Sequence, residues 1–416
     1  MPRDEIITGL DIGSMTIRVA MGQLDPTGQG IQILGASEAQ ADGLSKGAVT
    51  SIEDAVSSVS KALEDVERMT GIPVENAFVG IGGTHISAQE SHGVVAVSKA
   101  DGEIKEEDVE RVVEAAQTVA TPPNYEILHV LPRSFIVDNQ KGIKDPIGMT
   151  GIRLEVDAQI IQGLSSQIKN LTKCVYRTGV DINDVVVGVL AASESVLTKR
   201  QKELGVALVN LGGSTTSVLV FEEGDVIHAA ILPVGASHIT NDIAIGLRTS
   251  IDVAEKIKLE YGTAIPGDVA KRDEIRLEDI SQQETGVVER KHVAEIIEAR
   301  CEEIFKLIEK ELVKVDRSGL LPAGVVLTGG GAKLPGLVDI AKREFRLPAV
   351  VGFPQNIAHT PVDKINDPAW STAVGLVVWG ASLSAKHSGT GSSLPRFSSV
   401  ADVTGKMRKW FKSLIP

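Results

Sequence analysis

Residues that could bind a phosphate occur in two short glycine-containing loops, one in each half of the chain. The first reads Asp11-Ile12-Gly13-Ser14 and the second reads Asn210-Leu211-Gly212-Gly213-Ser214, and each lies between two apolar segments. Glycine lets backbone N–H groups approach phosphate oxygens, and a nearby hydroxyl adds a donor. A carboxylate or amide at the end of the preceding strand can hold water around a metal ion. Two such loops facing each other are expected to clamp a polyphosphate.

The residues expected to contact the phosphates are small or polar for the most part. They are Asp11, Gly13, Ser14, Met15 and Thr16 in the first loop, and Asn210, Gly212, Gly213, Ser214 and Thr215 in the second. Asp11 is also the expected metal contact, through water, to a Mg²⁺ ion bound by the phosphates. Either loop alone is more typical of an ordinary hairpin turn. Their matching positions in the two halves favour the phosphate-binding interpretation.

A third loop, Val325-Val326-Leu327-Thr328-Gly329-Gly330-Gly331-Ala332, places three glycines after an apolar strand. Gly329, Gly330, Gly331 and Ala332 are expected to let the backbone approach an adenine ring or an α-phosphate. The alternative is a tight strand-to-helix turn, which rarely needs three glycines. The sequence contains no GxxxxGK[ST] segment, so this is not a P-loop of the Walker A kind.

The elements that must position these loops are strands alternating with helices. Apolar segments at 6–12, 17–21, 206–211, 217–221 and 325–327 predict strands, and periodic segments at 51–69, 250–262, 290–315, 336–345 and 370–384 predict helices. This alternation indicates an α/β architecture, and the repeated strand–turn–strand loop indicates two similar lobes. Residues 84–162 differ, with a helix at 105–120 and strand-like runs around it, and predict a small α+β insert.

Composition limits the possible functions. The 416 residues carry a net charge of −13, which disfavours nucleic acid as a partner. The only cysteines, Cys174 and Cys301, have no CxxC partner, as expected for a protein of the reducing cytoplasm. No run approaches the ~18 apolar residues of a membrane span. A membrane contact would therefore be peripheral.

The C-terminal residues form such a candidate contact. Residues 386–405 are rich in serine and glycine and predict a flexible linker. Beyond it, apolar residues recur on one helical face and basic residues flank them; the expected membrane-binding residues are Val403, Met407, Arg408, Lys409, Trp410, Phe411, Lys412 and Leu414. An apolar face with a basic surround is typical of an interfacial helix. The alternative is a helix that docks on its own domain or on a protein partner.

The three loops together resemble the phosphate 1, phosphate 2 and adenosine motifs of actin-like ATPases. The resemblance implies an α/β actin-like ATPase fold, with two lobes built on duplicated ribonuclease-H-like subdomains and an inserted small α+β subdomain. It also implies that Glu255 and Lys258, on the helix that begins Asp252-Val253-Ala254, contact the ribose and base. An ordinary solvated helix face with charges three residues apart is the alternative there.

Within that superfamily the chain resembles the FtsA family of bacterial cell-division proteins over nearly its whole length. The resemblance rests on the insert, with Ile147-Gly148-Met149-Thr150-Gly151, on Pro233-Val234-Gly235-Ala236 after the second loop, on the triple glycine and on the tail. It implies the following division: 1–83, 163–203 and 366–385 form the first lobe (1A); 84–162 the SHS2-like insert (1C); 204–225 and 310–365 the second lobe (2A); 226–309 a smaller subdomain (2B); 386–402 a flexible linker; and 403–416 an amphipathic membrane-targeting helix.

The function implied by this resemblance is that of an adaptor. The protein would bind ATP or ADP with Mg²⁺, polymerise, and tether FtsZ filaments to the inner face of the cytoplasmic membrane at the division site. Its implied partners are the C-terminal peptide of FtsZ, docked on residues 226–309, further copies of itself, other division proteins and the membrane surface. The alternatives are a pilus-assembly adaptor of the PilM type, which would lack the basic tail, and an actin-like ATPase or kinase.

The second loop departs from the superfamily pattern at its first residue. Most actin-like ATPases carry aspartate where this chain has Asn210. An amide can hydrogen-bond metal-bound water, but it brings no charge and cannot act as a base. We therefore expect nucleotide binding with at most weak ATPase activity, and the sequence assigns no catalytic residue.

Overall fold

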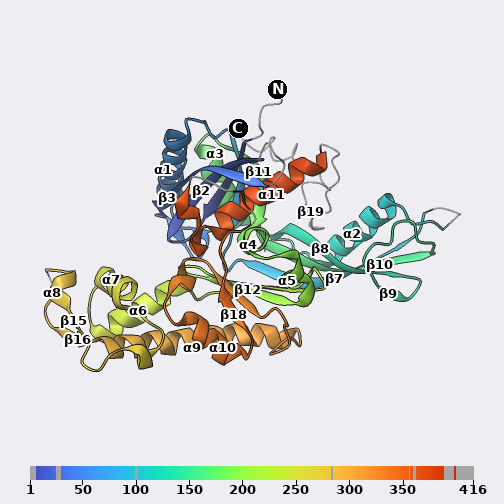
Figure 1. Cartoon of the computed structure of the whole chain (residues 1–416). Coiled ribbons are helices and arrows are strands. Elements are labelled where there is room, and N and C mark those ends of the chain that lie inside the picture. Colours follow the sequence, from blue (N-terminus) through green and yellow to red (C-terminus); the bar gives the residue numbers. More distant parts are fainter. Residues whose placement is uncertain are drawn as a thin grey trace.

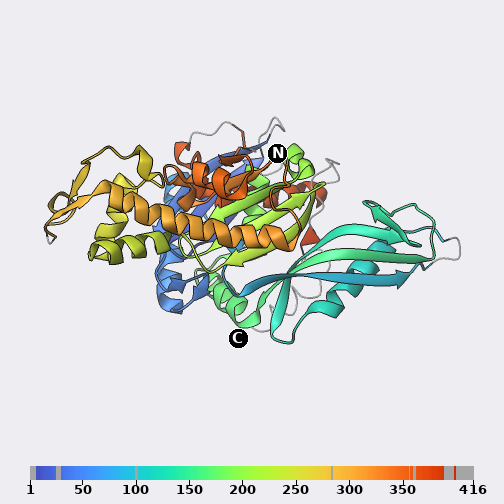
Figure 2. The same cartoon turned by 90° about the horizontal axis from the view of Figure 1, so that it is seen from below.

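The computed structural model describes residues 6–24, 30–98, 102–282, 284–355, 357–358, 362–387 and 398–399. Three mixed or antiparallel sheets dominate it, one in each of two lobes and one in a subdomain that projects to the side (Figure 1). Seen from below, this projecting subdomain and the helical end of the second lobe lie at opposite ends of the molecule (Figure 2).

The first lobe is a five-stranded sheet in the order β11-β6-β1-β2-β3, covered by helices on both faces. Its elements are β1 (Ile6–Ile12), β2 (Thr16–Leu24), β3 (Ile31–Gln40), the short β4 (Leu44–Ser45) and β5 (Ala48–Val49), α1 (Ile52–Thr70), β6 (Asn76–Ile81), α3 (Ser165–Arg177), β11 (Asp181–Val187), α4 (Gly188–Val196) and α11 (Ser371–His387). β1 and β2 form an antiparallel hairpin, whereas β6 and β11 run parallel to β1.

Helix α1 illustrates how the sequence sets these boundaries. The Ser51 hydroxyl accepts a hydrogen bond from Asp54 N at 3.4 Å and caps its start, and Gly71, at φ 71°, ends it in a left-handed conformation. Its apolar side chains, among them Val59, Leu63 and Val66, are buried in the first-lobe core. The apolar residues that recur with the 3.6-residue helical period therefore face the sheet, as predicted.

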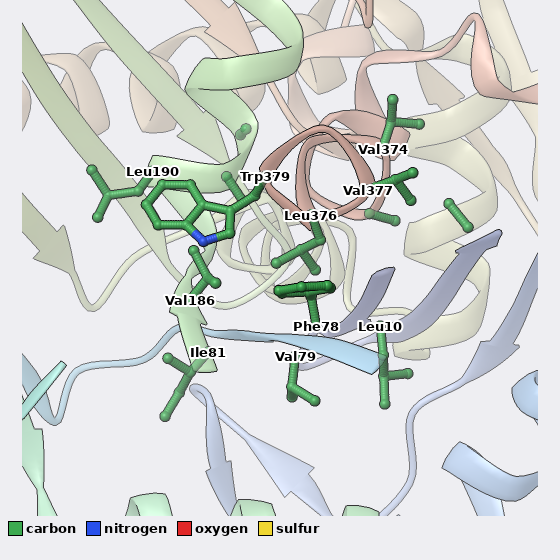
Figure 3. Close-up of a cluster of buried hydrophobic side chains, with 14 of the residues drawn as sticks. Leu10, Phe78, Val79, Ile81, Val186, Leu190, Val374, Leu376, Val377 and Trp379 are labelled. Atoms are coloured by element: carbon green, nitrogen blue, oxygen red, sulfur yellow. The ribbon is translucent and has the colours of Figure 1, made fainter. Parts of the chain in front are cut away.

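On the opposite face, α11 packs unusually close to the sheet and to α4. A Cβ on Gly9 of β1 would overlap the Ala373 carbonyl of α11, and one on Gly375 would overlap the Ala191 carbonyl of α4. Figure 3 shows the apolar side chains that fill the space around α11, with Leu376 and Trp379 above Phe78 and Leu10. The glycines let backbone approach backbone, so α11 is held firmly over the loop end of the sheet.

The second lobe repeats this plan with the sheet order β14-β13-β12-β17-β18. Its elements are β12 (Val206–Leu211), β13 (Thr216–Glu222), β14 (Asp225–Leu232), α6 (Ala236–Leu247), α7 (Ile251–Tyr261), β15 (Glu274–Arg276), α8 (Leu277–Ile280), β16 (Val287–Glu289), α9 (Arg290–Lys314), β17 (Val325–Thr328), α10 (Leu337–Phe345) and β18 (Ala349–Val351); α5 (Lys199–Leu204) leads into it. β14 belongs to the main sheet by its pairing with β13, so the subdomain boundary expected at residue 226 falls inside a strand. The boundary expected at 309 falls inside α9.

The insert is an antiparallel sheet with its own apolar core. It contains β7 (Ile86–Ala96), α2 (Glu106–Ala120), β8 (Tyr125–Val137), β9 (Gln140–Ile143) and β10 (Arg153–Leu164), and the two-residue β19 (Ser398–Ser399) pairs with β8. Val112 of α2 packs there with Ile104 and with Val156 of β10 in a buried core. The separate α+β character expected for residues 84–162 is therefore present as a distinct hydrogen-bonded unit.

A cluster of buried hydroxyls joins the two lobes at the start of α11. The hydroxyls of Thr328, at the end of β17, and Ser371, the first residue of α11, lie 2.6 Å apart. The Ser195 hydroxyl of α4 donates to the Ser371 carbonyl at 2.7 Å. All three side chains are almost fully buried, so each needs the partners it has.

The C-terminal tail lies largely outside the described residues. Helix α11 continues to His387, two residues into the segment expected as a linker. The expected membrane helix at 403–416 falls outside the described part of the chain, and the prediction stays a prediction. Among the described helices, none combines the length and the apolar character that crossing a membrane requires.

Candidate functional site

A cavity of about 630 Å³ lies between the two lobes, where the three glycine-containing loops converge. It is lined by fifteen of the sixteen residues expected to bind nucleotide, namely Asp11, Gly13, Ser14, Met15, Thr16, Asn210, Gly212, Gly213, Ser214, Thr215, Glu255, Lys258, Gly329, Gly330 and Gly331. Ala332 is the exception, because its side chain is buried behind the loop and lines a neighbouring cavity of about 450 Å³ instead. The structure thus brings together residues from both halves of the sequence.

The first two loops have similar geometry and touch each other. A Cβ on Gly13 would lie 2.6 Å from the Thr16 carbonyl oxygen, and one on Gly212 would lie 2.9 Å from the Thr215 carbonyl oxygen. Both hairpins therefore need glycine at the same place. Between the lobes, a Cβ on Gly213 would overlap the side chain of Met15, so glycine there lets the loops meet.

The second loop is fixed from behind by the start of α6. Ala236 N donates to the Gly212 carbonyl at 2.9 Å, and Ser237 N donates to the Gly213 carbonyl at 2.8 Å. The first loop is fixed by a turn between β4 and β5, because Gly47 N donates to the Ser14 hydroxyl oxygen at 2.9 Å. These bonds hold both loops in place before any ligand arrives.

Three helices begin at the cavity wall. The first turns of α4, α6 and α11 contribute Gly188, Ser237 and Thr372 to its lining. Helix N-termini carry partial positive charge and unpaired N–H groups, and both favour a bound anion. The dipoles of three helix starts at one cavity suit a polyphosphate, although in α6 the N–H groups of Ala236 and Ser237 already bond the second loop.

Asp11 is the acidic group at the end of β1. Burial raises the pKa of its carboxyl to about 6, against the opposing effect of the Arg18 guanidinium, which is its cross-strand neighbour. Arg18 itself pairs with Glu38 at 3.2 Å and lies over the Trp370 ring, 5.7 Å from its centroid. The Asp11 charge is therefore only partly compensated within the protein.

The donor set at Asp11 fits a Mg²⁺ ion held jointly with phosphates. Among the described residues, no group of three or more His, Cys, Asp or Glu side chains could hold a metal by itself. Mg²⁺ keeps several waters and takes only one or two carboxylates when substrate phosphates supply other ligands. A single, under-compensated carboxylate beside the two glycine-containing loops would meet that requirement.

Asn210 is the amide at the end of β12, at the place where Asp11 ends β1. Its Nδ2 donates to the Thr372 hydroxyl at 3.3 Å. On its other side, a Cβ on Gly329 would overlap the Asn210 Oδ1 atom. The amide is therefore confined between the first turn of α11 and the triple-glycine loop.

The three consecutive glycines have different tasks. Gly329 has φ 84°, ψ 169°, a backbone conformation almost confined to glycine, and Gly331 packs against the Leu211 side chain. Gly330 is unlike them, because the nearest atom to a Cβ there would be the Ala369 Cβ at 3.9 Å. Gly329 and Gly331 are needed because the loop packs closely on the second loop. Gly330 lines the cavity, where the absence of a side chain leaves room.

Glu255 and Lys258 lie together on α7 at the edge of the cavity. Lys258 Nζ donates to Glu255 Oε2 at 2.7 Å and to the Thr240 hydroxyl at 2.8 Å, and its side chain is only 10% exposed. A fully solvated helix face does not describe this lysine. The pair is anchored to α6 and directed to the cavity.

Several lining residues were missed by the sequence analysis. They include Arg18, Gly188, Ser237, Lys333 and Thr372. Gly188 follows a parallel strand much as Gly13 follows β1, and Arg18 lies two residues beyond Thr16 on the same strand face; these signals were available. Thr372 gave none, because only the long-range packing of α11 brings it to Asn210.

Comparison with known proteins gives consistent likenesses at the level of sequence. The model of the family described as "Cell division protein FtsA" matches residues 207–375, and that of the "SHS2 domain inserted in FTSA" matches 83–162. The chain is 36% identical to the cell division protein FtsA of Pseudomonas aeruginosa over 409 residues, covering 98% of this chain and 97% of that protein. It is 38% identical to the Bacillus subtilis FtsA, covering 91% and 84%, and 33% identical to that of Escherichia coli strain K12, covering 90% of each.

Solved structures extend the likeness at the level of fold. The structure titled "PilM-PilN type IV pilus biogenesis complex" matches with a TM-score of 0.66 at 14% identity, covering 90% of this chain and 98% of that one. MreB5 of Spiroplasma citri bound to ADP matches with a TM-score of 0.56 at 12% identity, covering 93% and 100%. The predicted actin-like α/β fold with an inserted α+β subdomain is confirmed.

A first prediction concerns Asp11, whose carboxyl pKa is raised from 3.8 to about 6 in the folded protein. Between these two pH values the folded protein carries more protons at Asp11 than the unfolded chain does. Stability without ligand therefore falls as pH rises through this window, and Asp11→Asn should be more stable at pH 8 by roughly 1–2 kcal/mol in thermal unfolding. The same variant should bind Mg²⁺–nucleotide more weakly. Below pH 6 the wild-type affinity should fall towards that of the variant, by at most about tenfold per pH unit.

Because nucleotide phosphates also titrate near pH 6, the informative quantity is the difference between wild type and Asp11→Asn. Binding without Mg²⁺ serves as the control, since the metal contact is then removed from both proteins. Parallel pH profiles of the two proteins in Mg²⁺ would show that the Asp11 carboxylate does not assist binding.

A second prediction uses the contrast between neighbouring glycines. Gly329→Ala should destabilise the protein by roughly 2–4 kcal/mol, because alanine is strained at this backbone conformation and its methyl group meets Asn210. Gly330→Ala should fold with wild-type stability to within about 1 kcal/mol, yet bind nucleotide less tightly, since its methyl group enters the cavity. Equal losses of melting temperature in the two variants would contradict the different tasks assigned to these glycines.

Proposed function

The chain belongs to the FtsA family of cell division proteins, and we propose that it binds ATP between its lobes, forms filaments and tethers FtsZ filaments to the cytoplasmic membrane. The single observation that carries the nucleotide part is the convergence of Asp11, Ser14 and Asn210, with both phosphate-type loops, on one interlobe cavity. The likeness to PilM is one of fold at 14% identity, so the pilus-assembly alternative is not favoured.

ATP or ADP with Mg²⁺ is the ligand that this cavity suits best. Structures of MreB5 of Spiroplasma citri, which shares the fold, are titled as bound to ADP and to AMPPNP. The phosphates would lie between the loops at 13–16 and 212–215, and the adenosine against Gly329–Gly331, with Glu255 and Lys258 near the ribose and base. Bound Mg²⁺ would neutralise phosphate charge, while the Asp11 carboxylate orients its water shell.

Slow hydrolysis is the expected consequence of the residues around the phosphates. Asn210 is uncharged, and its Nδ2 is already engaged by the Thr372 hydroxyl, so this side chain cannot take a proton from an attacking water. The bound nucleotide would then act mainly on the angle between the lobes. Phosphate release by the purified protein should therefore stay below about 1 s⁻¹, the low end of typical enzyme turnover, and faster steady release would refute this assignment.

The proposed partners follow from the family and from the tail. Residues 226–309, which contain α6, α7 and most of α9, are proposed to dock the C-terminal peptide of FtsZ. Filament formation brings further copies of the chain into contact, and other division proteins bind at the division site. We retain the division into 1A, 1C, 2A and 2B as a proposal, with β14 and the end of α9 shared between 2A and 2B.

Membrane attachment is proposed for residues 403–416. Each large apolar side chain that enters lipid can contribute about 1.5–3 kcal/mol before the cost of ordering the tail, and each basic residue near an anionic surface about 1 kcal/mol. So few residues give weak, reversible binding in a monomer. Filaments present many tails together, and avidity then makes attachment firm.

A third prediction tests this attachment directly. Full-length protein should co-sediment with anionic phospholipid vesicles, and a variant lacking residues 404–416 should lose most of that binding. Within the tail, replacing Trp410 and Phe411 by alanine should weaken binding more than replacing Lys409 and Lys412, and only the lysine contribution should fade at high salt. Undiminished sedimentation of the truncated protein would place the membrane contact elsewhere.

A further inference from the structure

The insert contacts both lobes, although the chain joins it to the first lobe alone. Its strand β8 packs against β11 of the first lobe. Strands β7, β8 and β10 also pack against β14, the edge strand of the second lobe's sheet. Figure 1 shows β7, β8 and β10 beside this edge. A change in the angle between the lobes must therefore alter at least one of these two contacts.

The contact with the first lobe is buried and strong. Val187 N, at the end of β11, donates to His129 Nε2 of β8 at 3.0 Å. His129 is fully buried and meets the Trp379 ring of α11 edge-on, with 5.6 Å between the ring centroids. Breaking this bond would leave a buried N–H group unsatisfied, which is costly. The insert should therefore move with the first lobe.

The contact with the second lobe has a buried apolar part, where β14 packs on β7, β8 and β10, and an exposed ionic end. Lys144, which follows β9 of the insert, pairs with the Asp225 carboxylate and lies 3.5 Å from a Glu223 carboxylate oxygen. Lys144 Nζ also donates to the Glu223 carbonyl at 3.4 Å. The Lys144 side chain is 43% exposed, so water can replace its partners at little cost. This ionic end, rather than the buried packing on β14 or the His129 bond, should open first.

Each contact lies on an element that reaches the nucleotide cavity. Val187 lines the cavity and precedes the first residue of α4. On the other side, β13 begins next to Thr215 of the second phosphate-type loop and ends at Glu222, beside the turn that Lys144 holds. A single strand therefore connects the phosphate end of the cavity to the ionic contact.

We propose that the insert is a latch across the lobes, fixed to the first lobe through His129 and closed on the second through Lys144 with Glu223 and Asp225. The engaged latch stabilises the arrangement in which the loops at Met15 and Gly213 meet, and it opens when the lobes part. The orientation of the insert relative to the second lobe then follows the state of the cavity. This inference rests on the nucleotide binding proposed above.

The test is a charge-reversal cycle on the latch. Lys144→Glu and Asp225→Lys should each speed dissociation of a fluorescent ATP analogue about two- to fivefold, the effect expected for an exposed ion pair. The double variant should return towards the wild-type rate, and the effects should fade at high salt. Lys141→Glu is the matched control, because it makes the same charge change on β9 at an exposed lysine with no ion pair among the described residues.

A second readout is independent of the ligand. Ile152 in the insert and Leu320 in the second lobe are 79% and 65% exposed, so cysteines placed there accept a dye pair, whereas Cys174 and Cys301 are buried. Energy transfer across this pair should fall in Lys144→Glu and recover in the double variant. If both single variants release the ATP analogue at the wild-type rate and show wild-type energy transfer between the two dyes, the latch is overturned.

The two readouts separate the two proposals. If the wild-type protein binds no nucleotide, the proposed function fails, and energy transfer alone still decides whether Lys144 holds the insert to the second lobe. If nucleotide binds but the cycle shows no coupling between positions 144 and 225, the latch fails and the nucleotide site stands.

Discussion

The buried hydroxyls of Thr328, Ser371 and Ser195 are the interaction on which the rest of the site depends. They join the end of β17 in the second lobe to α11 and α4 in the first, directly behind the cavity. Buried polar groups hold a unique arrangement when all are satisfied, because every alternative leaves a donor or acceptor unpaired. This junction therefore sets the position of Thr372, and through it that of the Asn210 amide.

Much of the site could be predicted from sequence because its loops carry their function locally. Gly13, Gly212 and Gly329 are glycines for steric reasons that act within a few residues, so the strand–glycine pattern marks them. The departure at Asn210 was also visible in the sequence, and the structure adds the reason for its orientation. Arg18 was equally local, because it lies two residues beyond Thr16 on the same face of β2.

What escaped prediction depends on contacts between distant segments. Thr372 reaches the cavity only because Gly9 and Gly375 let α11 lie close to the sheet and α4. Ala332 follows the glycines in sequence but turns into the core, since the loop becomes a short helical turn at Gly330. The place of β14 in the main sheet comes from its pairing with β13, which no local pattern in the sequence reports.

The way the insert is attached has a consequence for how such a chain can change. Its first and last strands are antiparallel neighbours, and Ile86 pairs directly with Gly163. The chain leaves the first lobe and returns to it at adjacent points. The geometry of the first-lobe sheet therefore does not depend on how many residues lie between them. A module with this attachment can be lengthened, trimmed or exchanged over generations while β6 and α3 keep their places. The same cavity between two lobes can thereby acquire new surfaces without being rebuilt.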